Sequence, residues 1–260
     1  LDEKIVAALA KVGIVNTFPI QAMTLPLALA GNDLIGQAKT GTGKTLGFGL
    51  PLVQSVLNSA ESKNPRALVV APTRELALQV AKDLEVATSQ TNLRVGAFFG
   101  GRAYEPQVEE LKRGIDIAVG TPGRLLDLAK QKFLTLAEVK VLVLDEADEM
   151  LDMGFLPDVE RIVSQTPDSR QTMLFSATMP GQIVALARRY MTNPTHVRAV
   201  NAQDETATVD AIEQHVWRAH PMDKAELIGR ILQAEGRNLA IIFCKTKRSA
   251  QNLHDELKER

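Results

Sequence analysis

The sequence predicts an α/β fold, a mostly parallel central sheet flanked by helices, on three observations. Short apolar runs rich in Val, Ile and Leu lack polar alternation, which is typical of strands buried on both faces of a parallel sheet. Segments with apolar residues three and four positions apart lie between these runs and indicate helices. The composition, 45% hydrophobic and 23% charged over 260 residues, is that of a globular chain and excludes disordered, collagen-like and coiled-coil classes.

Strands and helices are expected to alternate along the first 200 residues. The predicted strands are Asp33–Ile35, Ala67–Ala71, Val95–Phe99, Ile115–Val119, Val141–Leu144 and Thr172–Phe175. The apolar positions of the helices between them include Leu76, Val80, Leu84 and Ala87, then Val108 and Leu111, then Leu125, Leu128 and Ala129. This order predicts a sheet built from successive βα units.

The alternation is interrupted near Asn193–Thr208, where Asn193-Pro194 and a run of polar residues indicate a linker between domains. We therefore expect a first domain over residues 1–200, a linker at 201–210, and the beginning of an incomplete second α/β domain at 211–260. The elements expected there are a strand at Ile212–Trp217, a helix at Asp223–Gln233, a strand at Leu239–Cys244 and a helix capped by Thr246.

Net charge, cysteine content and the lack of a long apolar run limit what the chain can bind and where it can reside. The 30 basic and 31 acidic residues give a net charge of −1, so any contact with nucleic acid must be local. The single cysteine, Cys244, excludes an internal disulfide and a cysteine-based metal cluster, and we expect it and Trp217 to be buried apolar side chains. The sequence contains neither a membrane-spanning run nor a leader pattern at Leu1–Lys4, so we expect no membrane contact and a cytoplasmic protein.

A phosphate-binding loop is the strongest motif. It comprises Ala38, Lys39, Thr40, Gly41, Thr42, Gly43, Lys44 and Thr45. The loop follows a predicted strand and opens a helix, so its backbone amides and the helix N-terminus can bind phosphate, Lys44 can reach the β and γ phosphates, and Thr45 can ligate Mg²⁺. The general pattern begins with Gly, where this chain has Ala38. A Gly/Thr turn without a ligand is the alternative.

An acidic run, Asp145-Glu146-Ala147-Asp148, directly follows the strand Val141–Leu144. A carboxylate at the end of such a strand lies beside the phosphates, so we predict that Asp145 helps to hold Mg²⁺, partly through water, and that Glu146 orients or deprotonates the attacking water. An acidic helix N-terminus that interacts with the helix dipole is the alternative.

These motifs, in this order, resemble those of the DEAD-box ATP-dependent RNA helicases. The resemblance covers residues 13 to 200, and Ile241–Thr246 is similar to a further motif of the family. It rests on Ala38–Thr45, Asp145–Asp148, Pro72–Ala77, Gly100-Gly101, Thr121–Arg124 and Ser176–Thr178. The resemblance implies a RecA-like ATP-binding domain, a partial second RecA-like domain, ATP and Mg²⁺ as cofactors, and coupling of ATP hydrolysis to RNA unwinding or remodelling of RNA–protein complexes.

The segment Gly13–Gln21 resembles the family's adenine-reading segment, in which Gln21 would pair with the adenine edge. Ile14, Thr17 and Phe18 stand where the family usually has Phe, Pro and Thr, so the implied ATP selectivity depends on Gln21. A buried or helix-capping glutamine is the alternative.

Three further segments each follow a predicted strand, so they should emerge at one edge of the sheet. By resemblance this edge binds the RNA sugar-phosphate backbone independently of sequence, since its groups suit phosphates rather than base edges. The residues are Pro72, Thr73, Arg74, Glu75, Gly100, Gly101, Arg102, Thr121, Pro122, Gly123 and Arg124. Each segment taken alone is equally well explained as a capped turn.

Ser176 and Thr178 end the last predicted strand and can reach the acids at Asp145–Asp148. The resemblance implies that they link hydrolysis to strand separation, together with Lys44, Asp145, Glu146 and Asp148 as catalytic residues. Capping of the next helix by a Ser or Thr hydroxyl is the alternative.

The family's two arginine motifs of the second domain do not occur before Arg260. We therefore expect this chain to bind nucleotide without efficient turnover. A DNA translocase of the same superfamily and a non-enzymatic, nucleotide-gated RNA clamp are the remaining hypotheses.

Overall fold

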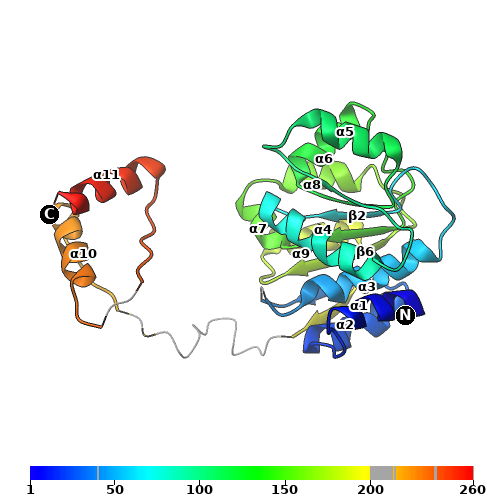
Figure 1. The fold of residues 1–260 in the computed structure, drawn as a ribbon, viewed down its shortest axis with the longest axis horizontal. Helices are drawn as coiled ribbons and strands as arrows, with labels where there is room; N and C mark the ends of the chain where they lie inside the picture. The colour runs from blue at the N-terminus through cyan, green and yellow to red at the C-terminus, as the bar shows by residue number, and fades with distance from the viewer. Residues whose placement is uncertain (40, 200–212, 214, 237–238, 260) are drawn as a thin grey trace. The chain divides into compact units, whose positions relative to one another are not determined.

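The computed structural model describes residues 1–39, 41–199, 213, 215–236 and 239–259, and the chain divides into two compact units, Leu1–Thr206 and Ala207–Arg260. The first unit contains the sheet, and the described residues of the second form two α-helices and a short 3₁₀ helix (Figure 1). The predicted linker at 201–210 lies outside the described residues. No helix among the described residues is both long and apolar enough to cross a bilayer.

The described part of the first unit contains a seven-stranded sheet in which every strand pair is parallel, with the order β3-β4-β2-β5-β6-β1-β7. The strands are β1 (Leu34–Gln37), β2 (Ala67–Val70), β3 (Val95–Phe98), β4 (Ile117–Gly120), β5 (Val141–Leu144), β6 (Gln171–Ser176) and β7 (Thr195–Arg198). This sheet confirms the predicted fold class, and the six predicted strands are present with bounds that shift by up to two residues.

Strand β7 was not predicted, although Thr195–Arg198 lies within the expected first domain, at the interruption of the pattern near Asn193–Thr208. It pairs with β1, and the amides of Thr195 and Ala199 donate to the carbonyls of Asp33 and Gln37. Only Val197 of this edge strand is buried, so the sequence has no apolar run that would have revealed it.

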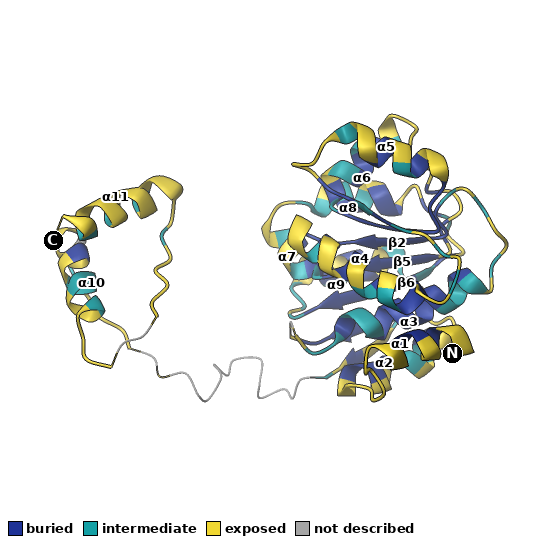
Figure 2. Ribbon diagram, viewed as in Figure 1, coloured by how far each residue is buried: buried dark blue, intermediate teal, exposed yellow. Residues whose placement is uncertain are grey.

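Two cores lie on opposite faces of the sheet, because successive strand residues alternate between faces. Ala67 and Val69 belong to one core, and Leu68 and Val70 to the other. The inner strands β1, β2, β4, β5 and β6 are buried beneath helices that expose their outer surfaces (Figure 2).

The helices of the first unit divide between these cores. The first core contains buried residues of α1 (Glu3–Lys11), α2 (Pro19–Leu29), α3 (Lys44–Leu57) and α4 (Arg74–Thr88). The second contains those of α5 (Tyr104–Arg113), α6 (Pro122–Lys130), α7 (Ala147–Asp152), α8 (Leu156–Val163) and α9 (Gly181–Tyr190). Both faces of the sheet are therefore covered, and its carboxyl edge is where loops present side chains to solvent.

In the second unit, the predicted helices are present as α10 (Lys224–Leu232), preceded by the short 3₁₀ helix η2 (Pro221–Asp223), and α11 (Lys247–Lys258). Thr246 caps α11, as predicted, by accepting a hydrogen bond from the amide of Ser249 at 3.1 Å. The strand predictions are wrong over the described residues, because 215–220 and 239–244 form no strand. Phe243 is 92% exposed, Trp217 is 57% exposed and Cys244 is only partly buried, which contradicts the expectation that Trp217 and Cys244 are buried. A strand requires a neighbour for its amides, and the described residues of this unit supply none.

Candidate functional site

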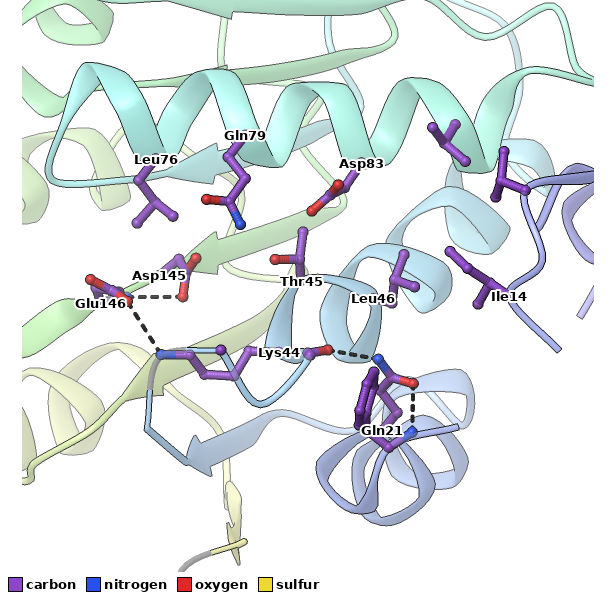
Figure 3. A pocket seen from close by; sticks show the side chains of 15 residues that line it. Ile14, Gln21, Lys44, Thr45, Leu46, Leu76, Gln79, Asp83, Asp145 and Glu146 are labelled. Carbon is purple, nitrogen blue, oxygen red and sulfur yellow. Dashed lines mark hydrogen bonds and ion pairs between the residues drawn. The ribbon is translucent and has the colours of Figure 1, made fainter. Parts of the chain in front are cut away.

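A cavity of about 470 Å³ lies where the loop after β1 meets the segment after β5. Figure 3 shows Leu76, Gln79 and Asp83 of α4 facing Thr45 and Leu46 of α3 across it. The cavity is also lined by Val12, Ile14, Phe18, Gln21, Gly41, Gly43, Lys44, Val86, Asp145 and Glu146. The structure thus brings together the predicted phosphate loop, the first two acids of the Asp145–Asp148 run and Gln21.

The phosphate loop has the backbone that its glycines predict. Gly41 and Gly43 both have φ of 82°, a left-handed conformation that side chains disfavour. The amide of Ala38 donates to the carbonyl of Ser176, which ties the loop to the end of β6 at 3.2 Å. The Thr42 hydroxyl donates to the carbonyl of Lys39 at 2.8 Å, while Thr40 lies outside the described residues.

Lys44 begins α3 and is only 6% exposed. Its Nζ lies 3.5 Å from Glu146 Oε1 and has no hydrogen-bond partner among the described residues (Figure 3). A buried ammonium in this state is costly unless an acceptor reaches it. An anionic ligand such as a polyphosphate fits this position, because it would supply the missing acceptors.

Asp145, at the end of β5, is 2% exposed. Burial raises the pKa of its carboxyl to about 6, although the nearby ammonium of Lys44 lowers it. A divalent cation fits beside this carboxyl, because it would favour the ionised form that burial disfavours. No group of three or more His, Cys, Asp or Glu side chains among the described residues is arranged to hold a metal ion. Asp145 and Thr45 would therefore need phosphate oxygens and water as the other ligands of Mg²⁺.

Asp148 forms a compact network with the end of β6. Its carboxylate accepts from the amide and the hydroxyl of Thr178, both at 2.9 Å, and its own amide donates to Ser176 Oγ at 3.2 Å. Burial raises the pKa of Asp148, but these hydrogen bonds outweigh burial and lower it. The alternative interpretation as helix caps is not observed, because α9 begins after Pro180 without a side-chain cap.

Glu146, at the N-cap of α7, has a φ of 50°, a conformation uncommon for a residue with a side chain. Backbone strain of this kind is often found at functional sites. The acidic first turn of α7, with Asp148 and Glu149, also matches the alternative interpretation as a helix-dipole interaction. Both interpretations of the acidic run are compatible with this geometry.

Gln21 is 3% exposed and connects α2 with the phosphate loop. Its Oε1 accepts from the amide of Phe18 at 2.9 Å, and its Nε2 donates to the carbonyl of Gly43 at 2.8 Å (Figure 3). The alternative of a buried, capping glutamine is therefore present in the structure. These two hydrogen bonds leave a second lone pair and a second N–H of the amide unused.

The three edge segments, Pro72–Glu75, Gly100–Arg102 and Thr121–Arg124, follow β2, β3 and β4, which are consecutive in the sheet. They therefore meet at one edge, as the sequence predicted. Thr73 caps α4 by accepting from the amide of Leu76 at 3.2 Å, so the capped-turn alternative holds for this residue, whereas Thr121 precedes α6 without a side-chain cap.

The remaining members of the edge segments differ in exposure. Glu75, Gly100, Gly101, Arg102 and Gly123 are exposed, as is Arg74, whereas Arg124 is half-buried and Pro72 and Pro122 are buried. Gly101 has a φ of 76°.

Several residues that line the cavity are not among the predicted site residues. Leu76, Gln79, Asp83 and Val86 lie at spacings of three and four along α4, so they share one helix face, and this spacing was the available signal. Burial raises the pKa of Asp83. The side chains of Ile14 and Phe18 also line the cavity, although both depart from the pattern expected of the adenine-reading segment.

Comparison with known proteins agrees with this geometry. The family model described as DEAD/DEAH box helicase matches residues 18–186. The ATP-dependent RNA helicase CshA of Listeria monocytogenes is 46% identical over 253 residues, which cover 97% of this chain and 48% of that protein. The DEAD-box ATP-dependent RNA helicase CshA of Bacillus licheniformis is 45% identical over 257 residues, 99% of this chain and 52% of that protein.

A solved structure supports the same relationship. The crystal structure of a DEAD box protein from the hyperthermophile Methanococcus jannaschii has a TM-score of 0.73 and 36% identity, and the match covers 100% of this chain and 68% of that one. The chain spans about half the length of the curated relatives described above. The chain therefore belongs to the DEAD/DEAH box helicase family, as shown by its likeness in sequence and structure, its parallel sheet with a phosphate loop, and its Asp-Glu-Ala-Asp run after β5.

Proposed function

We propose that the chain is the ATP-binding part of an RNA helicase that couples ATP binding and hydrolysis to local unwinding of RNA duplexes or remodelling of RNA–protein complexes. The observation that carries the proposal is the buried Lys44 ammonium, which has no hydrogen-bond partner in the described structure and lies beside Asp145 and Glu146. The names of the curated relatives support the same activity.

Within this proposal, each side chain of the cavity has a role that its position allows. Lys44 pairs with the β and γ phosphates, and the amides of the phosphate loop donate to their oxygens. Thr45 and Asp145 hold Mg²⁺, partly through water, and the bound ion neutralises phosphate charge. Glu146 orients the attacking water or accepts its proton. Gln21 pairs with the adenine edge, and the Asp148–Ser176–Thr178 network connects the acids to β6.

The three edge segments bind the RNA backbone without regard to sequence. Arg74, Arg102 and Arg124 supply cations, while the exposed glycines and the N-termini of α4 and α6 supply amides. Because few cations take part, the binding should be only modestly dependent on salt.

Slow turnover by this chain is also part of the proposal. Lys44 is the only cationic side chain among the described residues that line the cavity. Phosphoryl transfer is commonly accelerated about 10³-fold or more by an additional arginine that contacts the transferring group. The chain should therefore bind ATP firmly and hydrolyse it slowly.

A titration with a fluorescent ADP analogue, competed by ADP and by GDP, tests the nucleotide site. We expect the wild-type chain to bind adenine nucleotide selectively. Lys44→Ala should abolish binding, and Gln21→Ala should remove the selectivity for adenine. Lys130→Ala, an exposed lysine outside the cavity, is the matched control and should bind as the wild type does. Unselective binding that is unaffected by Gln21→Ala would remove the adenine assignment, and binding unaffected by Lys44→Ala would refute the site.

A further inference from the structure

Two of the edge arginines lie on aromatic rings. The guanidinium carbon of Arg74 is 5.3 Å from the centroid of Phe99, and that of Arg124 is 5.1 Å from the centroid of Tyr104. Both distances are within the range of a cation–π contact. Phe99 directly precedes the Gly100–Arg102 segment, and Tyr104 begins α5 shortly after it. The two rings therefore flank one edge segment, and each contacts an arginine from another.

Both rings are themselves held in place. Phe99 is 2% exposed, and its amide donates to Oε1 of the fully buried Gln107 at 3.0 Å. Tyr104 packs edge-on against Phe133, with ring centroids 6.2 Å apart and an interplanar angle of 69°. A fixed ring restricts the rotamers of the arginine that stacks on it, so the guanidinium loses less freedom when a ligand binds.

The arginines keep donors for a ligand. Arg74 is exposed, and Arg124 donates one hydrogen bond, from Nη2 to the carbonyl of Arg102 at 3.4 Å. Arg124 Nη1 is covered and has no partner in the described structure, so a phosphate oxygen would have to contact the other nitrogens of this half-buried guanidinium. Stacking occupies the face of a guanidinium and leaves the N–H groups at its edge to point outward.

We propose that Phe99 and Tyr104 are positioning residues for RNA binding, which hold the guanidinium groups of Arg74 and Arg124 in the orientation that contacts RNA phosphates. The inference rests on the proposed function, because it assumes that the three edge segments bind RNA. It differs from a purely structural role for the rings in one respect: the effect of removing a ring must depend on the arginine above it.

A double-mutant cycle on Tyr104 and Arg124 tests this dependence in the 260-residue chain. The variants are Tyr104→Leu, Tyr104→Phe, Arg124→Ala and the double variant Tyr104→Leu/Arg124→Ala. Tyr104→Phe is the matched control, since it keeps the ring and removes only the hydroxyl. Binding of a short fluorescent oligouridylate is followed by anisotropy at a series of KCl concentrations, and thermal melting of each variant is recorded separately.

We expect Arg124→Ala to weaken RNA binding and to reduce the slope of log K against log[KCl] by about 0.7, the value for one lost phosphate contact to a single strand. Tyr104→Leu should weaken binding about two- to tenfold, the factor that corresponds to ordering one released arginine side chain when RNA binds. Tyr104→Phe should bind as the wild type does. In the Arg124→Ala background, Tyr104→Leu should have no further effect.

Equal RNA affinities for Tyr104→Leu and the wild type, with Arg124→Ala still impaired, would overturn the inference and leave the proposed function standing. An undiminished effect of Tyr104→Leu in the Arg124→Ala background would also overturn it, because the ring would then act independently of the arginine. Failure of the wild-type chain to bind RNA would refute the proposed RNA interface and the inference with it. The same cycle with Phe99→Leu and Arg74→Ala tests the second pair.

Discussion

The buried carboxyl of Asp145 makes the free energy of unfolding depend on pH. Burial raises its folded-state pKa to about 6 from an ordinary value of 3.8, so between these values the folded chain binds the proton more tightly than the unfolded chain. The carboxyl therefore makes its full contribution to the free energy of unfolding below about pH 4. This contribution is lost as the pH rises through about 6. At about 1.4 kcal/mol per pKa unit, the total is about 3 kcal/mol.

Asp145→Asn removes this titration. We expect the variant, in buffer with a chelator and without nucleotide, to match the wild type in free energy of unfolding near about pH 4 and to exceed it by about 3 kcal/mol at about pH 7. Urea unfolding across this pH range measures the difference. A difference that is constant with pH would show that the carboxyl titrates normally in the folded chain.

Gly43 and Gly41 form a matched pair of residues. Both have φ of 82°, so alanine at either position costs about 1 kcal/mol in backbone conformation. A Cβ at Gly43 would lie 2.7 Å from Gln21 Nε2 and 2.8 Å from Phe18 Cδ2, whereas a Cβ at Gly41 would meet nothing within 4 Å.

We therefore expect Gly43→Ala to destabilise the nucleotide-free chain by at least about 1 kcal/mol more than Gly41→Ala, since it also displaces the Gln21 amide from the loop. Chemical denaturation of both variants gives the comparison. Equal losses of stability would mean that the contact between α2 and the phosphate loop adjusts without cost.

At the scale of elements, the amino ends of β2 and β4 are joined by a buried ion pair. Arg66 Nη2 lies 2.5 Å from Asp116 Oδ1, and Arg66 Nη1 donates to the carbonyls of Val56, Ser59 and Ala60. Both side chains are less than 10% exposed. The pair therefore also fixes the end of α3 and the loop that leads into β2.

Asp116→Asn should cost about 3–5 kcal/mol of stability, because it leaves the Arg66 guanidinium buried without its counter-charge. Glu160→Gln is the control, since its pair with Arg189 at 3.4 Å is largely exposed and should change stability by about 0.5 kcal/mol. Equilibrium unfolding in urea measures both. Similar values for the two variants would contradict a special role for the buried pair.

The strands that could be predicted most accurately from the sequence are those in which every residue is buried. Strands β2 and β5 are continuous apolar runs with every residue buried, and their positions follow from periodicity alone. Strand β7 could not be predicted this way, since its pairing with β1 uses backbone groups and only Val197 enters the core. Apolar runs in the second unit predicted strands that the described structure lacks, because strand formation also depends on a neighbour.

The residues of the candidate site also differ in whether local sequence or tertiary packing determines their position. Lys44, Asp145 and Gln21 could be located from sequence because each belongs to a run whose spacing is fixed locally. The spacing along α4 shows only that Asp83 shares a helix face with Leu76 and Gln79, and that this face lines the cavity depends on how α4 lies in the fold. The aromatic partners of Arg74 and Arg124 depend likewise on how β3, α5 and α6 are arranged in space.

At the scale of the whole molecule, stability is unequally distributed between the units. Both cores consist entirely of residues from the first unit, and Ala225 is the only buried apolar side chain among the described residues of the second. Leu239, Ile241 and Phe243 are 96%, 81% and 92% exposed.

Hydrogen exchange on the intact chain should therefore show amides of β2 and β5 that open only with global unfolding, and amides at 239–243 that exchange close to the rate of an unstructured peptide. Mass spectrometry of peptic fragments resolves both segments. Protection at 239–243 equal to that of β2 would mean that these residues are paired in solution.

The place of β1 in the sheet has a consequence for synthesis on the ribosome. Leu34 pairs with Met173 of β6 and with Thr195 of β7, so its second neighbour is translated about 160 residues later. At about 5–20 residues per second, this delay is about 10–30 s. The phosphate loop that follows β1 is therefore translated early but acquires its supporting strands late, and during that interval the nascent chain holds an unpaired apolar strand.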